Sequence, residues 1–178
     1  NQSLSNTEWF SSVYVEPDLD AVGETHQLPM KVHVSPQVRN QLETSIGYST
    51  DVGARGKIRW KKPWLNKYGH SLDTALSISK PEQEATISYK IPLEQVLKDY
   101  YIVKYGLKNV DNRDTDSLES NLAFERHWVY DSGWHRTIYT RFLYEEFTQG
   151  IQDGTAWLVL PGISFSKSRT RGGTMPMW

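Results

Sequence analysis

Residues 53–62 read Gly-Ala-Arg-Gly-Lys-Ile-Arg-Trp-Lys-Lys, and this stretch decides the fold class of the chain. Every second residue from Arg55 to Lys61 is basic, while Ile58 and Trp60 stand between them. Successive side chains of a β-strand point to opposite faces, so this spacing puts the cations on one face and the apolar side chains on the other. Such a run could also bind nucleic acid through cations and stacked aromatics, but the separation of the two residue types favours a two-faced strand.

The same alternation continues on both sides in segments of about ten residues separated by turns. It predicts eight strands, over residues 41–52, 53–62, 71–79, 84–91, 100–108, 118–128, 138–145 and 157–165. On one face only Lys62 and Arg126 are charged, whereas the other collects charges such as Asp73, Lys104 and Arg141. Strands of this length can cross a bilayer at a tilt, so the pattern predicts a transmembrane up-and-down β-barrel.

Two alternatives share this pattern. A soluble β-sandwich binding domain also hides one face and exposes the other, and a passive outer-membrane pore would alternate in the same way. The tryptophans favour a membrane barrel, because Trp60, Trp64, Trp128 and Trp134 surround two turns that an up-and-down order puts at one side of the membrane. An aromatic girdle lies at that level in membrane barrels.

The composition and the remaining motifs narrow the classes of function. A formal net charge of -1 argues against a partner bound by bulk electrostatics, and the absence of cysteine excludes disulfides and thiolate chemistry. Asn112, Asp114 and Asp116 have the alternate spacing of a calcium loop, but its glycine and distal glutamate are missing. The five histidines lack zinc spacing, and residues 162–166 lack the second glycine of a nucleophile elbow. We therefore expect no catalytic residue, no metal and no cofactor.

The first 36 residues form a different unit. Residues 4–10 are predicted to be the last turns of a helix, residues 13–16 and 30–34 two strands, and Pro36 a boundary, since proline cannot donate to a sheet ladder. One helix end and one hairpin bury too little surface to be stable alone. This part is therefore expected to complete a domain that begins before Asn1.

Several motifs resemble a known family. They are residues 43–53, residues 60–64 with 68–72, and residues 168–173 with Met175 and Pro176. They closely resemble the TamA family, the outer-membrane subunits of the translocation and assembly module within the BamA/TamA superfamily. The resemblance implies that residues 1–36 are the C-terminal part of the last POTRA domain and a linker. Residues 37–178 would then be the first half, about eight antiparallel strands, of a sixteen-stranded barrel, so the chain would be a fragment.

The resemblance also implies a function in the bacterial outer membrane, with the N-terminal part in the periplasm. Members insert or secrete outer-membrane proteins, autotransporters among them, with a TamB-like inner-membrane partner and without ATP or a cofactor. The first barrel strand would form a lateral seam that pairs with client strands through Gln41, Glu43, Ser45, Gly47, Ser49 and Asp51. The lumen would be lined by the charges of Arg55, Lys57, Arg59 and Lys61, and the acidic loop 109–117 would face outside. An ordinary barrel strand without special lability is the alternative to a seam.

Overall fold

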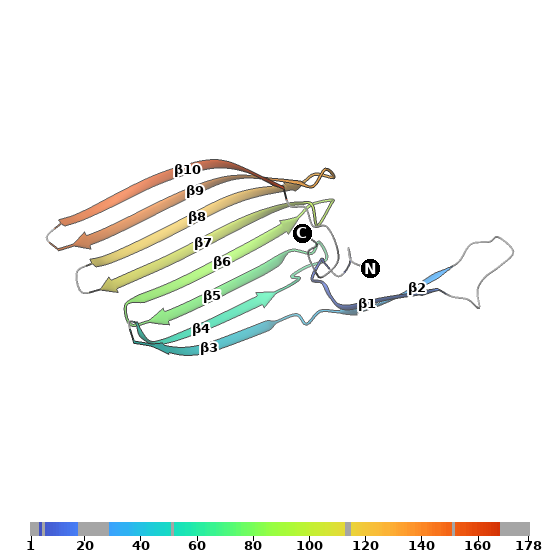
Figure 1. Cartoon of the computed structure of the whole chain (residues 1–178), viewed down its shortest axis with the longest axis horizontal. Helices are drawn as coiled ribbons and strands as arrows, with labels where there is room; N and C mark the ends of the chain where they lie inside the picture. Colours follow the sequence, from blue (N-terminus) through green and yellow to red (C-terminus); the bar gives the residue numbers. More distant parts are fainter. Residues whose placement is uncertain are drawn as a thin grey trace, which may run out of the picture.

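The computed structural model describes residues 4, 6–17, 29–50, 52–112, 115–150 and 152–167, which form an all-β fold of antiparallel strands (Figure 1). A two-stranded sheet pairs β1 (Phe10–Pro17) with β2 (Met30–Pro36). The second sheet has eight strands, namely β3 (Gln41–Ser49), β4 (Gly53–Lys62), β5 (Ser71–Ser79), β6 (Glu82–Pro92), β7 (Asp99–Asn112), β8 (Thr115–Val129), β9 (Trp134–Gln149) and β10 (Gln152–Lys167).

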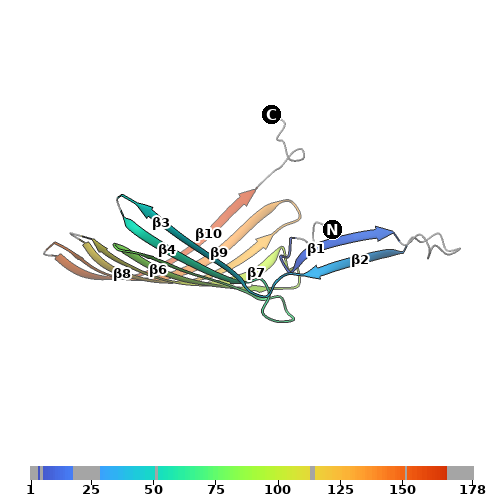
Figure 2. The same ribbon diagram turned by 90° about the horizontal axis from the view of Figure 1, so that it is seen from below.

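The eight-stranded sheet is an up-and-down meander, because each strand pairs with its neighbours in sequence from β3 to β10. Among the described residues β3 and β10 are its edges, so the sheet is open and forms a curved trough (Figure 2). The connections 63–70, 93–98 and 130–133 lie at the end of the sheet that adjoins the β1–β2 hairpin, which we call the hairpin end. The turn at residues 80–81, between β5 and β6, lies at the far end.

The ladder register confirms the predicted alternation across the sheet. Val103 pairs with Tyr89 and Phe124, whereas the next residue, Lys104, pairs with Ser88 and Ala123. Residues paired across antiparallel strands share a face, so the register defines an apolar face and a charged face. Leu76, Tyr89, Val103 and Phe142 lie on the apolar face, and Asp73, Lys104 and Arg141 lie on the charged face.

Strands β7 to β10 extend well beyond their predicted ends, to 14, 15, 16 and 16 residues. The prediction of a long acidic loop at 109–117 is wrong, because Asn112 pairs with Thr115 and the ladder continues almost to the turn. The hydrogen bonds of a ladder join backbone groups and do not depend on the side chains. Polar residues can therefore continue a strand beyond its alternating part. Asn112 and Asp116 are strand residues, Asp114 lies outside the described residues, and the described part holds no cluster of metal-ligating side chains.

The segment before β1 is not the helix that the sequence predicts. Of residues 4–10 only Leu4 is helical among those described, and the Thr7 backbone N–H and hydroxyl both donate to the Leu4 carbonyl in a turn. Glu8 then adopts a positive φ of 59°, which ends any helical continuation. Nowhere in the described ranges is there a helix long and apolar enough to span a membrane.

The hairpin is tied to the eight-stranded sheet at the hairpin end. The Gln37 backbone N–H donates to the Trp9 carbonyl at 2.8 Å, and the Trp64 indole N–H donates to the Gln37 carbonyl at 3.2 Å. Lys61 of β4 forms an ion pair with Glu8 at 2.6 Å. The Trp9 ring lies directly on Gly69, where a Cβ atom would come within 2.0 Å of it. These contacts hold the base of the β1–β2 hairpin against the hairpin end of the eight-stranded sheet.

Candidate functional site

The outer edge of β3 is the first candidate site. β3 pairs with β4 alone, so alternate backbone N–H and C=O groups along it point away from β4 and lack a ladder partner among the described residues. The positions predicted for client pairing that the structure describes all lie on the charged face of this strand; they are Gln41, Glu43, Ser45, Gly47 and Ser49. Asp51 lies outside the described residues.

Side-chain packing contributes little to the β3 edge. On its apolar face, Leu42, Ile46 and Tyr48 are 67%, 93% and 78% exposed. On its charged face Gly47 has no side chain, and the Arg55 side chain occupies the space, its Nε 3.1 Å from where a Cβ would stand. The strand is therefore held mainly by one backbone ladder, which suits an edge that exchanges partners.

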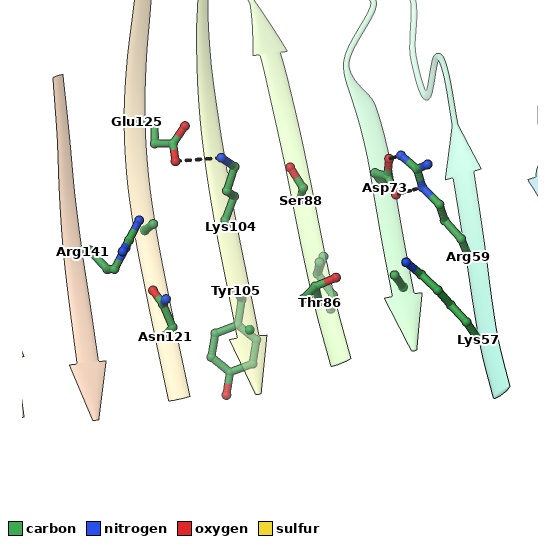
Figure 3. A pocket seen from close by; sticks show the side chains of 14 residues that line it. Lys57, Arg59, Asp73, Thr86, Ser88, Lys104, Tyr105, Asn121, Glu125 and Arg141 are labelled. Carbon is green, nitrogen blue, oxygen red and sulfur yellow. Dashed lines mark hydrogen bonds and ion pairs between the residues drawn. The ribbon is translucent and has the colours of Figure 1, made fainter. Parts of the chain in front are cut away.

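The charged face forms a hollow that spans the sheet from β4 to β9 (Figure 3). It is lined by charged, polar and small side chains, among them Lys57, Arg59, Asp73, Ala75, Ser88, Lys104, Gly106, Asn121, Ala123, Glu125 and Arg141. One hollow can be lined by six consecutive strands only if the sheet curves toward this face. The charged face is therefore the concave one, and the apolar face is convex.

Ion pairs order the side chains in this hollow. Arg59 donates to both carboxylate oxygens of Asp73, at 2.9 Å from Nε and 2.5 Å from Nη2, a bidentate pair. Lys104 donates to Glu125 at 2.8 Å, and His127 contacts the other oxygen of Glu125 at 2.9 Å. Charged and polar side chains thus dominate the hollow, as expected of a water-facing wall, although Ile87 and Tyr105 also line it.

The four basic residues predicted to line the lumen all belong to the charged face by register, but they do different things. Lys57 and Arg59 line the hollow. Arg55 lies over Gly47 toward the β3 edge, and Lys61 turns to Glu8 at the hairpin end. Only two of the four thus share one site.

The apolar face is bare. Among the described hydrophobic side chains only Ala123, on the charged face, is buried, while large apolar residues such as Ile58, Leu76, Phe124, Phe142 and Val159 are more than a third exposed. No second sheet covers this face in the described ranges, so the sandwich alternative lacks its other layer. Soluble proteins rarely leave a contiguous apolar surface of this extent open to water.

Charges bound the apolar face at both ends. On β8 the face is free of charge between Arg126 and Asp116, and on β9 between Arg136 and Glu146, about ten residues in each case. Ten residues span about 34 Å along a strand, or about 26 Å of height at a tilt of about 40°. That height matches the apolar band of roughly 25 Å that membrane barrels present to lipid.

Aromatic rings and cations share the rim of the apolar face at the hairpin end. Lys62 lies 5.2 Å from the Trp60 ring, Arg39 lies 4.8 Å from the Trp64 ring, and Lys167 lies 5.3 Å from the Trp134 ring. Trp128 stands between two arginines, Arg126 and Arg136. The four tryptophans therefore lie at one end of the sheet, as predicted for a girdle.

Sequence reasoning missed Arg136 and Asp99 as members of this rim. The predicted strands began at Ile138 and Tyr100, so both charges fell outside them. Extending the alternation back from Ile138 in steps of two, through Arg136 to Trp134, would have placed Arg136 on the apolar face.

A cross-connection ion pair lies beyond this rim. Lys98, between β6 and β7, donates a hydrogen bond to Asp131, between β8 and β9. The hydrogen bond from Lys98 is the main reason why the pKa of the Asp131 carboxyl lies below its ordinary value, and the attraction of the Lys98 charge is the second. The pair links two connections that are not adjacent in sequence.

No family model matches the chain. Among solved structures it is similar to BamA from Haemophilus ducreyi lacking POTRA domains 1-3, with a TM-score of 0.68 and 11% sequence identity over 98% of this chain. The match covers 38% of that protein, so the chain spans well under half of its length. This likeness shows that the chain has the fold of part of a BamA-type barrel. Membership of the BamA/TamA superfamily and the closer resemblance to TamA stay predictions.

Proposed function

We propose that the chain is part of an outer-membrane β-barrel whose apolar face contacts lipid and whose charged face borders water. The observation that carries this proposal is the bare apolar face, which is free of charge over roughly the height of a bilayer's apolar band and is bordered by aromatic rings. The likeness to part of BamA supports the same location. The sequence resemblance implies that the β1–β2 hairpin lies on the periplasmic side.

Within that membrane we propose that the protein inserts or secretes other outer-membrane proteins, autotransporters among them, and has no enzymatic activity. The unpaired edge of β3 supports this function, since an incoming strand can extend the sheet there by β-augmentation. Residues 1–36 would end the last POTRA domain, and a TamB-like inner-membrane protein would be the periplasmic partner. Both assignments follow from the sequence resemblance.

Cysteine cross-linking tests the client-pairing proposal in a chain that has no cysteine of its own. Ser45 on β3 and Ser77 on β5 both pair with Lys57, one from each side, so they occupy the same row of the charged face. We expect Ser45→Cys to form a disulfide with a cysteine in the last strand of an autotransporter during its assembly. Ser77→Cys, two strands from the edge, should give none.

The alternative of a passive pore predicts a different outcome. A pore needs the hollow on the charged face but not a reactive edge, so neither cysteine would cross-link to a client strand. Equal cross-linking from the two positions would show that collision rather than edge pairing brings the client close. Either result would remove β3 as the client-binding strand.

A further inference from the structure

Two arginines meet on one tryptophan ring at the rim of the apolar face. The Cζ atoms of Arg126 and Arg136 lie 4.7 Å and 4.1 Å from the centre of the Trp128 ring. Trp128 and Arg136 are directly paired between β8 and β9, and Arg126 precedes Trp128 by two residues on the same face. Because both arginines lie on one ring, their Cζ atoms are at most about 9 Å apart, and two cations at such a separation repel each other unless an anion neutralises them.

The protein supplies only part of that neutralisation. Asp99 forms an ion pair with Arg126 at 2.7 Å, but the described residues place no carboxylate within ion-pair distance of Arg136. Lys167 on β10 adds a third cation, which lies beside Trp134 of β9. Three cations against one carboxylate leave the rim positive. It therefore attracts an anion from outside the protein.

Hydrogen-bond donors remain unused in the same place. Nε of Arg136, and Nε and Nη1 of Arg126, are shielded from water and donate to no acceptor in the described part of the chain. The shielded atoms leave the two guanidinium groups incompletely paired. Arg136 can bind an anion through its Nη atoms, which are not among the shielded ones, and the planar fork of arginine matches the oxygens of a phosphate. The ligand that suits this rim is thus an anion with several oxygens.

An apolar groove begins at Arg126 and follows the apolar face. Its walls come mainly from β7, β8 and β9, with Ile91 of β6, and include Tyr101, Val103, Phe124 and Ile138. Arg126 lies at its border, and Glu125, which also lines it, belongs to the charged face by register. The groove lies inside the charge-free band, whereas the arginines lie at its boundary. A molecule with an anionic head and a hydrocarbon tail would match both parts at once.

We propose that Arg126, Trp128 and Arg136 form a binding site for the phosphate of an anionic phospholipid, whose acyl chain lies in the groove between β7, β8 and β9. This proposal rests on the membrane location proposed above, which puts the rim at the height of the lipid headgroups. The cations beside Trp60 and Trp64 stand singly, so the paired arginines distinguish this part of the rim.

Native mass spectrometry of the full chain in detergent micelles tests the site, with dimyristoylphosphatidylglycerol as the probe. We expect Arg136→Gln to weaken binding about tenfold, the factor for one charge-assisted hydrogen bond. Arg141→Gln is the matched control, because Arg141 lies on the same strand but on the charged face. Dimyristoylglycerol, which lacks the phosphate, should not bind at this site, and millimolar inorganic phosphate should not displace the lipid.

Three results would overturn the proposal. They are equal affinities of the two glutamine variants, binding of dimyristoylglycerol as tight as that of the phospholipid, and displacement by inorganic phosphate, which would indicate a site for free anions. Circular dichroism checks the sheet of each variant. Should Arg136→Gln lose its sheet, Arg136→Lys decides instead, since it keeps the charge, loses the planar fork and should weaken binding about threefold.

The two proposals can fail separately. Insertion of the unmodified chain and of Arg136→Gln into phosphatidylcholine vesicles, without selective binding of phosphatidylglycerol, would overturn the lipid site and leave the membrane location standing. Failure of the unmodified chain to enter any vesicle would overturn the membrane location, and the lipid site with it.

Discussion

Neighbouring residues on one strand meet opposite surroundings in the proposed barrel. Leu76 on β5 pairs with Ile58 and Ala85 on the apolar face, and Ser77 pairs with Lys57 and Glu84 on the charged face. Leu76→Arg should lower the free energy of unfolding in phospholipid vesicles by about 2 to 4 kcal/mol if the site is near the bilayer midplane. Ser77→Arg should cost less than about 1 kcal/mol. Guanidinium titration of both variants measures this, and equal costs would contradict the lipid-facing assignment.

Two glycines with nearly the same backbone conformation differ in what surrounds them. Gly69 (φ 75°) lies under the Trp9 ring, while Gly53 (φ 78°) has open space where a Cβ would stand. Alanine at either position meets the same left-handed backbone cost, about 1 kcal/mol. Gly69→Ala should cost about 1 to 3 kcal/mol more than Gly53→Ala, because the Trp9 ring must move.

A double variant separates the Trp9 contact from the backbone cost. In a Trp9→Ala background the extra cost of Gly69→Ala should disappear, because no ring remains to be displaced. Guanidinium titration measures the free energy of unfolding of the unmodified chain, the two single variants and the double variant. A cost of Gly69→Ala that is unchanged without Trp9 would show that the ring does not hold the N-terminal segment against the sheet.

The face of each central strand residue could be predicted from the sequence, because strict alternation of charge and apolar character is a local property. The rim could not. Arg136 and Asp99 are charged residues on the otherwise apolar face, so a pattern that scores apolar content ends the strand before them. The helix predicted for residues 4–10 failed because the Glu8 backbone and the contact of Trp9 with Gly69, remote in sequence, override local propensity.

At the scale of the strand, β3 and β5 differ in the number of ladders that hold them. β3 pairs with one neighbour and β5 with two. Opening β3 breaks one ladder, so its backbone amides should exchange with solvent faster than those of β5 by at least about tenfold. Hydrogen–deuterium exchange of the chain in micelles measures both strands at once. Equal protection would argue against a labile edge and would favour an ordinary barrel strand.

The connections offer a pH-dependent contact. The folded pKa of Asp131 is depressed by Lys98, so the pair contributes above the ordinary aspartate pKa of about 3.9 and is lost as pH falls through the depressed value. NMR titration of the Asp131 carboxyl should give a pKa below the ordinary value, and Lys98→Met should return it. An unchanged pKa in Lys98→Met would assign the shift to another group. Asp131 is exposed, so the effect on stability should be small.

Strand existence was easier to predict than strand length. The bounds of β4 and β5 match their predictions, because these strands end where turn residues follow. In β7 and β8 the ladder continues through Asp111 and Asp116, where both faces are polar and alternation is lost. The backbone hydrogen bonds that extend these strands leave no trace in side-chain pattern.

In the molecule as a whole, the eight-stranded sheet is one curved layer without a core of its own among the described residues. Its two faces need two different surroundings, and the proposed membrane supplies lipid to the convex face and water to the concave one. The sequence predicted this two-faced sheet and its up-and-down order. The alternation within each strand does not show whether the first and last strands pair with each other, so the open edges of the described sheet could not be predicted from it.

Spin labels on β8 test this central claim most directly, because the chain has no cysteine and each introduced one is labelled alone. In phospholipid vesicles, labels at Leu122 and Phe124 should collide mainly with oxygen, which concentrates in lipid. Labels at Ala123 and Glu125 should collide mainly with a water-soluble nickel chelate. We expect access to oxygen and to the chelate to alternate with a period of two residues. Equal access of all four labels to the nickel chelate would contradict it.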